Sequence, residues 1–271
     1  MHNHDPAPDG IRVTRDHATT YLTMAKPERG NRLDWTMVVA LLQAVRAVAT
    51  DPECRLLVLA GDGEDFCVGD CWPAMGPWPE AWKNRLPGGT HGAPPLPLTD
   101  LLSTLRALPI PTLAVLQGEV ADAGLDLACH CDIRLAADNA RFCDRRVAHA
   151  RFAATGITYV LPRLIGQSQA SRLLLFGDTF DASQAAQMGL VYDRVPAAGL
   201  ANAAGALAIR LAGMATRSYG MVKQQVLEQL DLDYRNALLH SMAIRQTNVF
   251  EDRAEGQRAF LEKRAPRFSG R

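Results

Sequence analysis

The chain has 271 residues, of which 48% are hydrophobic, so it can bury the core of one large domain or of a domain with an appendage. Lysine plus arginine and aspartate plus glutamate both number 29, which gives a formal net charge of zero. This balance argues against a nucleic-acid-binding protein, which usually carries a basic excess, and any anionic ligand would need a local basic patch.

The beginning of the chain and its cysteines favour a cytoplasmic protein. Residues 1–10 lack a basic region followed by an apolar run, and we expect a short polar tail there. No segment approaches the roughly 18 apolar residues that cross a membrane, so we expect no membrane partner. The six cysteines are expected to be reduced thiols. Two cysteine pairs fit no common zinc spacing, so we expect no metal: Cys67/Cys71, and Cys129/Cys131 with His130.

The first elements alternate between strand and helix. Residues 11–24 are rich in β-branched side chains around a central turn, which predicts a hairpin. Residues 34–51 have apolar positions at helical spacing, with Asp34 as the N-cap. The apolar run 56–61 ends in glycine and is typical of a buried parallel strand. This alternation indicates an α/β fold.

Residues 72–97 interrupt the alternation, because they are rich in proline, glycine and tryptophan. They are expected to form a long loop of the kind that often carries function. After this loop the alternation resumes. The predicted elements are a helix over 98–108, a strand over 111–118, a helix from 123, a strand over 133–137, helices over 161–177 and 180–190 with Asp181 as a cap, and a strand over 191–196.

From about residue 198 the pattern is entirely helical. The sequence therefore predicts a strand–helix core over 11–197 and a helical C-terminal region over 198–271. The stretches LLLH and MAIRQTNVF in this second region are too apolar for a solvated end, so we expect the region to mediate oligomerisation.

Several segments, in their order and spacing, together resemble the crotonase (enoyl-CoA hydratase/isomerase) superfamily: PERGNRL, DFCVG, LPIPTLAVLQG, GLDLACHCDIRLAADNARF, LPRLIG, AAQMGLVYDRV and FLEKRAPRFSGR. The resemblance covers nearly the whole chain. It implies an α/β spiral of ββα units with a helical trimerisation region, and it implies trimers or hexamers. It also implies an enzyme of the lyase or isomerase type that acts on an acyl-CoA.

The resemblance implies an oxyanion hole made of two backbone N–H groups. A thioester activated at its α-carbon develops negative charge on its carbonyl oxygen, and preorganised N–H donors stabilise that charge. The matching donors are the N–H of Val68 and the N–H of Ala123, at a helix start. This chain has Asp122 and Ala123 where the family usually has glycines, and we expect Asp122 to cap the helix.

The acid–base residues depart from the family pattern. Two glutamates of the hydratases map to Asp126 and Arg146, and arginine cannot act as a base at ordinary pH. Asp126 is then a lone general base while Arg146 holds a substrate carboxylate, or the two form a structural ion pair. Alternatively the acid–base group comes from Asp144, His149 or the loop residue His91.

The resemblance implies a basic patch for coenzyme A, built from two groups of residues. The first group, near the start of the chain, is Lys26, Arg29 and Arg32, and the second, near its end, is Lys263 and Arg264. In the family the second group often comes from a neighbouring subunit. Coenzyme A is expected as part of the substrate, with no other cofactor.

Two alternative functions stay open. One is a dehydratase or decarboxylase of polyketide β-branching that acts on an acyl-carrier-protein thioester, and the other is a non-catalytic crotonase-fold binding protein.

Overall fold

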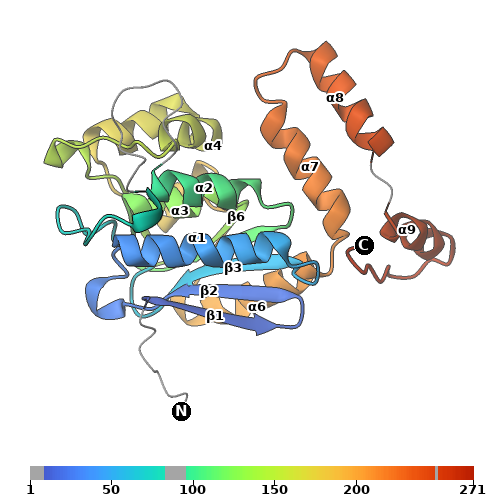
Figure 1. Ribbon diagram of the computed structural model, residues 1–271, viewed down its shortest axis with the longest axis horizontal. Helices are drawn as coiled ribbons and strands as arrows, with labels where there is room; N and C mark the ends of the chain where they lie inside the picture. The colour runs from blue at the N-terminus through green and yellow to red at the C-terminus, as the bar shows by residue number, and fades with distance from the viewer. Residues whose placement is uncertain (1–8, 83–95, 248–249) are drawn as a thin grey trace.

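The computed structural model describes residues 9–82, 96–247 and 250–271 (Figure 1). Its centre is a six-stranded sheet in which only β1 and β2 are antiparallel, while the later neighbours are parallel. In order across the sheet the strands are β1 (Ile11–Asp16), β2 (Thr19–Met24), β3 (Leu56–Gly61), β4 (Thr112–Leu116), β6 (Ile133–Ala137) and β9 (Asp193–Val195). The predicted hairpin is therefore confirmed, and so is the α/β fold.

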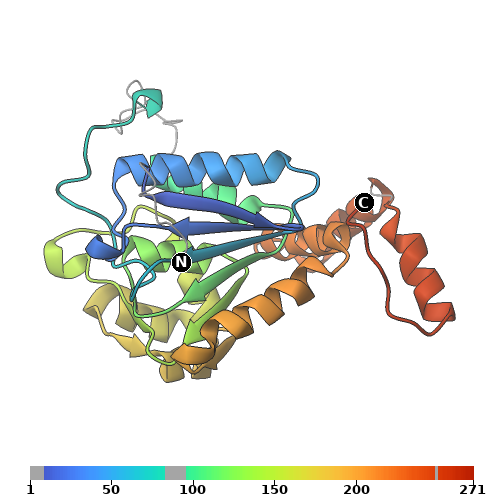
Figure 2. The same ribbon diagram turned by 90° about the horizontal axis from the view of Figure 1, so that it is seen from below.

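Both faces of this sheet are covered, because successive side chains of a strand point to opposite sides. In β3, Leu57 and Leu59 join the larger apolar cluster, whereas Leu56 and Val58 join a second cluster with side chains of α6 (Leu200–Ala212). Figure 2 shows α1 (Trp35–Thr50) and α2 (Pro97–Ala107) on one side of the sheet and α6 on the other. Such burial on two faces explains why these strands are continuous apolar runs.

Two predicted helix caps are present. The Asp34 carboxylate accepts from the N–H of Met37 at 2.9 Å at the start of α1. Asp181 forms a capping box with Gln184 at the start of α5 (Ala182–Gln187). Helix α4 (Ile157–Ser171), which precedes α5 in the chain, continues into a π-helical turn over Arg172–Phe176.

A second, three-stranded sheet was not predicted from the sequence. It consists of β5 (Glu119–Ala121), β7 (Arg141–Cys143) and β8 (Phe180–Asp181), with β5 and β7 parallel. Helix α3 (Ala123–His130) begins only two residues after β5, so this sheet fixes where the helix starts. The candidate site is built at that junction.

The C-terminal part consists of α7 (Thr216–Glu228), α8 (Tyr234–Thr247) and α9 (Asp252–Leu261), which project from the core in Figure 1. Helix α7 is tied to the core because Nζ of the buried Lys223 donates to Asp132 at 2.9 Å. In the described ranges no single helix is long and apolar enough to cross a membrane, and the segments Ala197–Ala212 and Thr216–Glu228 pass that test only as a pair bent by 97°.

Candidate active site

The start of helix α3 forms one wall of the candidate site. The main chain turns sharply before it, since Asp122 has φ 49° and ψ −114°. The Asp122 carbonyl accepts the first helical hydrogen bond, from the N–H of Asp126 at 3.0 Å. Within the described part of the chain, the N–H of Ala123 donates to no acceptor. This donor is therefore available at a helix end, where the backbone dipoles favour an anion.

The prediction that the Asp122 side chain caps α3 is wrong. Its Oδ1 accepts from the N–H of Arg145 at 2.7 Å instead, and no side chain caps the helix. Burial raises the pKa of Asp122, although the hydrogen bond from Arg145 opposes this shift. Because the carboxylate is bonded elsewhere, it leaves the N–H of Ala123 uncovered.

The loop after β3 approaches the same junction closely. Cys67 pairs with Val120 of β5 in a parallel bridge. A Cβ on Gly124 would lie 2.3 Å from the carbonyl oxygen of Cys67, and a Cβ on Gly69 would lie 3.0 Å from Oδ2 of Asp122. At Gly124 a Cβ would collide with main chain, so only glycine fits there, and Gly69 has φ 116°, a conformation that favours glycine. The loop 67–70 therefore lies directly against the turn that precedes α3.

The predicted donor Val68 does not fit this geometry. Its N–H donates to the carbonyl of Gly30 at 2.9 Å, so it is already engaged. The N–H of Asp70 is the available donor of this loop, because it has no acceptor among the residues described here. The N–H of Leu33 donates to the carbonyl of Gly69 at 2.9 Å, and the carbonyl of Leu33 accepts from the N–H of Cys71 at 2.8 Å, so the bridging hydrogen bonds involve the residues before and after Asp70. The N–H of Asp70 therefore points away from Leu33.

Behind the start of α3 lies a buried triad of one arginine and two aspartates. Nη1 and Nη2 of Arg146 donate to the two carboxylate oxygens of Asp126, each at 2.8 Å. Nε of Arg146 donates to Asp144 at 3.0 and 3.1 Å, and Nη2 donates to Asp144 at 2.5 Å. The exposed fractions are 0% for Asp126, 2% for Asp144 and 3% for Arg146. The ion pair that the sequence offered as one alternative is therefore present, with Asp144 as a third member.

The electrostatics of this triad are dominated by burial. Burial raises the pKa of Asp126, although the hydrogen bonds and charge of Arg146 act against this shift. Burial tends to lower the pKa of Arg146, but the two carboxylates outweigh it and raise that pKa. The Thr155 hydroxyl is buried beside Asp126 and favours its charged form, yet it makes no hydrogen bond of ordinary geometry. One guanidinium between two carboxylates leaves one negative charge in excess.

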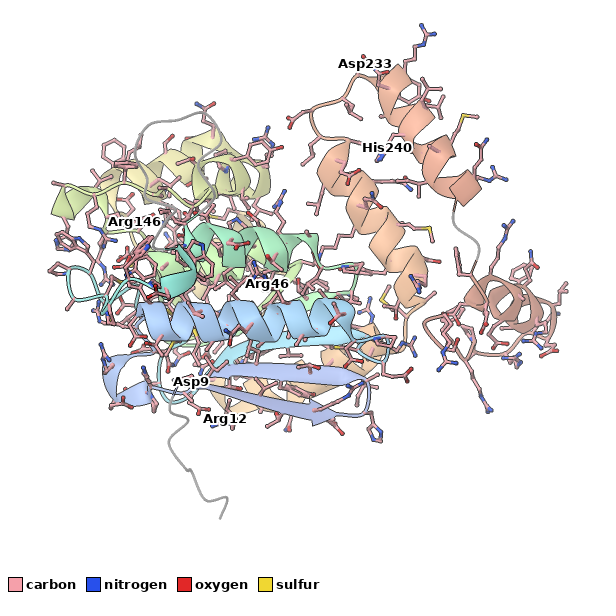
Figure 3. All side chains as sticks on the ribbon, viewed as in Figure 1. Asp9, Arg12, Arg46, Arg146, Asp233 and His240 are labelled. Atoms are coloured by element: carbon pink, nitrogen blue, oxygen red, sulfur yellow. The ribbon has the colours of Figure 1, made fainter. Side chains whose placement is uncertain are left out.

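The triad bears on the predicted roles of its members. The guanidinium of Arg146 is occupied by Asp126 and Asp144, so it is not free to hold a substrate carboxylate as well. His149 is exposed on a 3-10 turn and makes no contact with Asp126 that would make it a partner. The predicted loop residue His91 lies outside the described residues. Figure 3 shows Arg146 at the end of the core away from the C-terminal helices, where His240 is labelled.

The two predicted basic groups lie far apart in one chain. Lys26 and Arg29 both approach the carboxylate of Asp34, at 3.1 and 3.6 Å, and Arg32 donates to the carbonyl of Asp70 at 3.3 Å. This first group therefore adjoins the loop that carries the N–H of Asp70. The second group follows α9 on the opposite side of the molecule (Figure 1), where Arg264 pairs with Glu255 and Glu262.

The six cysteine side chains are buried and unpaired. Burial raises the pKa of Cys67, Cys129 and Cys131 to about 12, so their thiols are protonated at neutral pH. His130 is also buried, with Nδ1 2.7 Å from the carbonyl of Asp126. In the described ranges, no group of three His, Cys, Asp or Glu side chains comes together as a metal site.

The chain is similar to known proteins over most of its length. The enoyl-CoA hydratase/isomerase family model matches residues 14–271. An (E)-benzylidenesuccinyl-CoA hydratase of Thauera aromatica is 34% identical over 92% of this chain and 95% of its own length. A 1,2-epoxyphenylacetyl-CoA isomerase of Escherichia coli K12 is 32% identical over 92% of this chain and 94% of its own.

Solved structures give the same result for the fold. The crystal structure of an enoyl-CoA hydratase from Bacillus anthracis superposes with a TM-score of 0.85, at 25% identity, over 97% of this chain and 100% of its own. A family match over nearly the whole chain and relatives above 30% identity, on top of the junction between the β3 loop and α3, lead to one conclusion: the chain belongs to the enoyl-CoA hydratase/isomerase family.

Proposed function

We propose that this enzyme binds an acyl-CoA thioester and stabilises its enolate oxygen between the N–H groups of Ala123 and Asp70. The observation that carries this proposal is the close approach of Gly69 to Asp122, which brings the residues that follow them to the same junction. Both N–H groups lack acceptors in the described part of the chain. Donors of this kind typically contribute about 10²–10³-fold each to the rate.

We propose Asp126 as the group that accepts a proton from the α-carbon. The triad of Asp126, Arg146 and Asp144 carries one negative charge in excess, so uptake of one proton makes it neutral. Burial raises the pKa of Asp126 and supports this role, because a buried excess charge favours proton binding. A single proton acceptor suits isomerisation better than hydration, which needs a second group to manage the water.

We propose that the coenzyme A phosphates contact Lys26, Arg29 and Arg32, which adjoin the Asp70 loop. Lys263 and Arg264 are too distant in the same chain and would serve a neighbouring subunit of a trimer or hexamer. Coenzyme A enters as part of the substrate.

We propose an aryl-bearing acyl group as the substrate class. Two relatives above 30% identity act, by their names, on benzylidenesuccinyl-CoA and epoxyphenylacetyl-CoA. Trp72 supports this choice, because this residue is 51% exposed and lies only two residues after Asp70. An exposed indole beside a thioester site offers a face on which an aromatic acyl group can stack.

A turnover screen tests the proposal. Aryl and alkyl enoyl-, β-keto- and malonyl-type CoA thioesters are incubated with the protein and followed by mass spectrometry. We expect turnover of an aryl thioester, lowered about 10²–10⁴-fold by Asp126→Asn. The matched control is Asp231→Asn, which removes a 64% exposed carboxylate and should leave the rate unchanged.

One observation favours a non-catalytic protein as the second candidate, because both oxygens of Asp126 are bound to Arg146. Binding of coenzyme A, seen as a raised melting temperature, without turnover of any thioester would support that candidate. A shift caused by an acyl-carrier-protein thioester and not by millimolar coenzyme A would point to the carrier-protein alternative.

A further inference from the structure

A second arginine, Arg151, holds the loop that carries the N–H of Asp70. Its Nη1 and Nη2 donate to the two carboxylate oxygens of Asp70 at 3.0 and 2.6 Å. Its guanidinium lies over the ring of Trp72, 4.8 Å from the centroid, and the N–H of Trp72 donates to Oδ1 of Asp70 at 3.1 Å. The Asp70 residue is only 9% exposed, so solvent screens its charge weakly.

Arg151 and Arg146 belong to the same short turn. The 3-10 turn Val147–His149 closes at Ala150, which has φ 55°, and the N–H of Arg151 then donates to the carbonyl of Arg146 at 2.9 Å. This one turn therefore carries both Arg146, whose guanidinium binds Asp126, and Arg151, whose guanidinium binds Asp70. The position of the proton acceptor and the position of the donor loop are set by the same six residues.

The side chain of Asp70 creates an electrostatic problem for the site. Its carboxylate belongs to the same residue as the N–H that we assign to the enolate oxygen. Two negative charges so close together in a poorly screened site repel strongly, and this repulsion opposes enolate formation. The carboxylate nevertheless stabilises the loop, because it accepts a hydrogen bond from the N–H of Trp72 and so fixes the turn.

We infer that Arg151 is a positioning residue whose charge cancels the Asp70 carboxylate beside the enolate oxygen and whose two hydrogen bonds hold the donor loop. This inference rests on the proposed function. Arg151 does not touch the reacting atoms. It acts through Asp70, and it lets the loop use a carboxylate to fix its turn without placing a net negative charge beside the thioester.

The test measures enolate formation directly, as deuterium uptake at the α-carbon of phenylacetyl-CoA in D₂O. We expect Arg151→Gln to slow this exchange roughly 10–100-fold, while KM for phenylacetyl-CoA changes little, because the unpaired Asp70 charge mainly opposes the enolate. Adding Asp70→Asn to Arg151→Gln should recover most of the lost rate, since the opposing charge is then gone. Arg151→Lys keeps a positive charge and should lose less than Arg151→Gln.

The outcomes separate this inference from the proposed function. Absence of exchange in the wild-type enzyme, together with absence of turnover in the thioester screen, overturns the proposed function and the role of Arg151 with it. Exchange in the wild type with an equal rate in Arg151→Gln overturns the role of Arg151 alone. A double variant that is as slow as Arg151→Gln also overturns it, because a merely structural ion pair gives that result. If Arg151→Gln does not fold, a rate in Arg151→Lys that falls 10-fold or more at unchanged melting temperature contradicts a charge effect.

Discussion

At the scale of single residues, Arg146 of the buried triad is expected to affect the stability of the fold more directly than the reaction. A buried arginine that pairs with two carboxylates cannot be replaced by a neutral residue without leaving more uncompensated charge in the core. The residue therefore bears on folding before it bears on any reaction. Restoring the glutamate that the family usually has at this position would add a third carboxylate to the same buried cluster.

We expect Arg146→Gln to lower the free energy of unfolding by about 3–5 kcal/mol, because two carboxylates lose their partner. Arg146→Glu should cost at least as much. Denaturant unfolding at neutral pH measures the effect, with Arg163→Gln as the control, since the pair of Arg163 and Asp231 is exposed and its loss should cost under about 1 kcal/mol. Lowering the pH should restore part of the stability of Arg146→Gln, because protonated carboxyl groups carry no charge. Equal losses in the two Arg→Gln variants would contradict this prediction.

His130 gives a second prediction, for the dependence of stability on pH. Burial lowers the pKa of His130 to about 4, from an ordinary value near 6.5. The unfolded chain therefore binds this proton first as the pH falls, and stability is lost between about pH 6.5 and pH 4. The loss from this group is on the order of 3 kcal/mol. Thermal unfolding between pH 7 and pH 4 should show a smaller drop in melting temperature for His130→Asn than for the wild type. His17→Asn, at a 95% exposed side chain, should behave as the wild type does.

At the scale of elements, the junction of helix α3 with the β3 loop depends on the absence of a single side chain. Gly124 lies in α3, and a Cβ there would meet the carbonyl oxygen of Cys67 at 2.3 Å. Gly205 lies in α6 and would meet nothing within 4 Å. We expect Gly124→Ala to destabilise the protein by about 1–3 kcal/mol and to lower turnover, because the helix start must shift away from the loop. Gly205→Ala should stabilise it by about 0.5–1 kcal/mol. A stabilising Gly124→Ala would show that the approach is looser than the structure has it.

Local patterns predicted the longer elements well. The caps at Asp34 and Asp181 and the apolar run of β3 each have a cause within a few residues of sequence, so the sequence alone suffices for them. The second sheet was missed because β5 and β7 have three residues each, which is too short for an alternation of polar and apolar positions to appear.

Parts of the site depend on contacts between distant segments, and no local pattern predicts them. The N–H of Val68 donates to the carbonyl of Gly30, so the donor of this loop that has no acceptor among the described residues is the N–H of Asp70. Asp122 occupies the position of a cap, but its positive φ turns its carboxylate toward the N–H of Arg145. The roles proposed for Ala123 and Asp126 came from the family resemblance and are compatible with their places at the start of α3.

At the scale of the whole molecule, the C-terminal helices expose apolar side chains that one chain does not cover. Val222, Val226 and Leu230 are 50–59% exposed along one side of α7 and the residues after it, and Leu238 and Met242 of α8 are also half exposed. Contiguous apolar surface of this kind usually marks an interface. The separation of the two basic groups in one chain agrees with the expectation that subunits complete one another.

We expect light scattering at micromolar concentration to show a trimer or hexamer. Val226→Glu should shift the protein toward smaller species, because it places a charge in the exposed apolar face of α7. Val13→Glu, at a 53% exposed position of β1, is the control and should leave the mass unchanged. A wild-type monomer would contradict the prediction.

The origin of the two N–H donors has a consequence for how this sequence can evolve. Main-chain N–H groups survive nearly every substitution, so mutation rarely deletes the two groups proposed to bind the thioester oxygen. The carboxylates at positions 126 and 144 and the guanidinium at 146 can each be lost in one step. After a gene duplication, a copy can therefore explore new proton-transfer chemistry while it keeps its hold on the same class of substrate. When substrate binding is retained and only the proton-transfer groups change, one scaffold can come to catalyse many reactions.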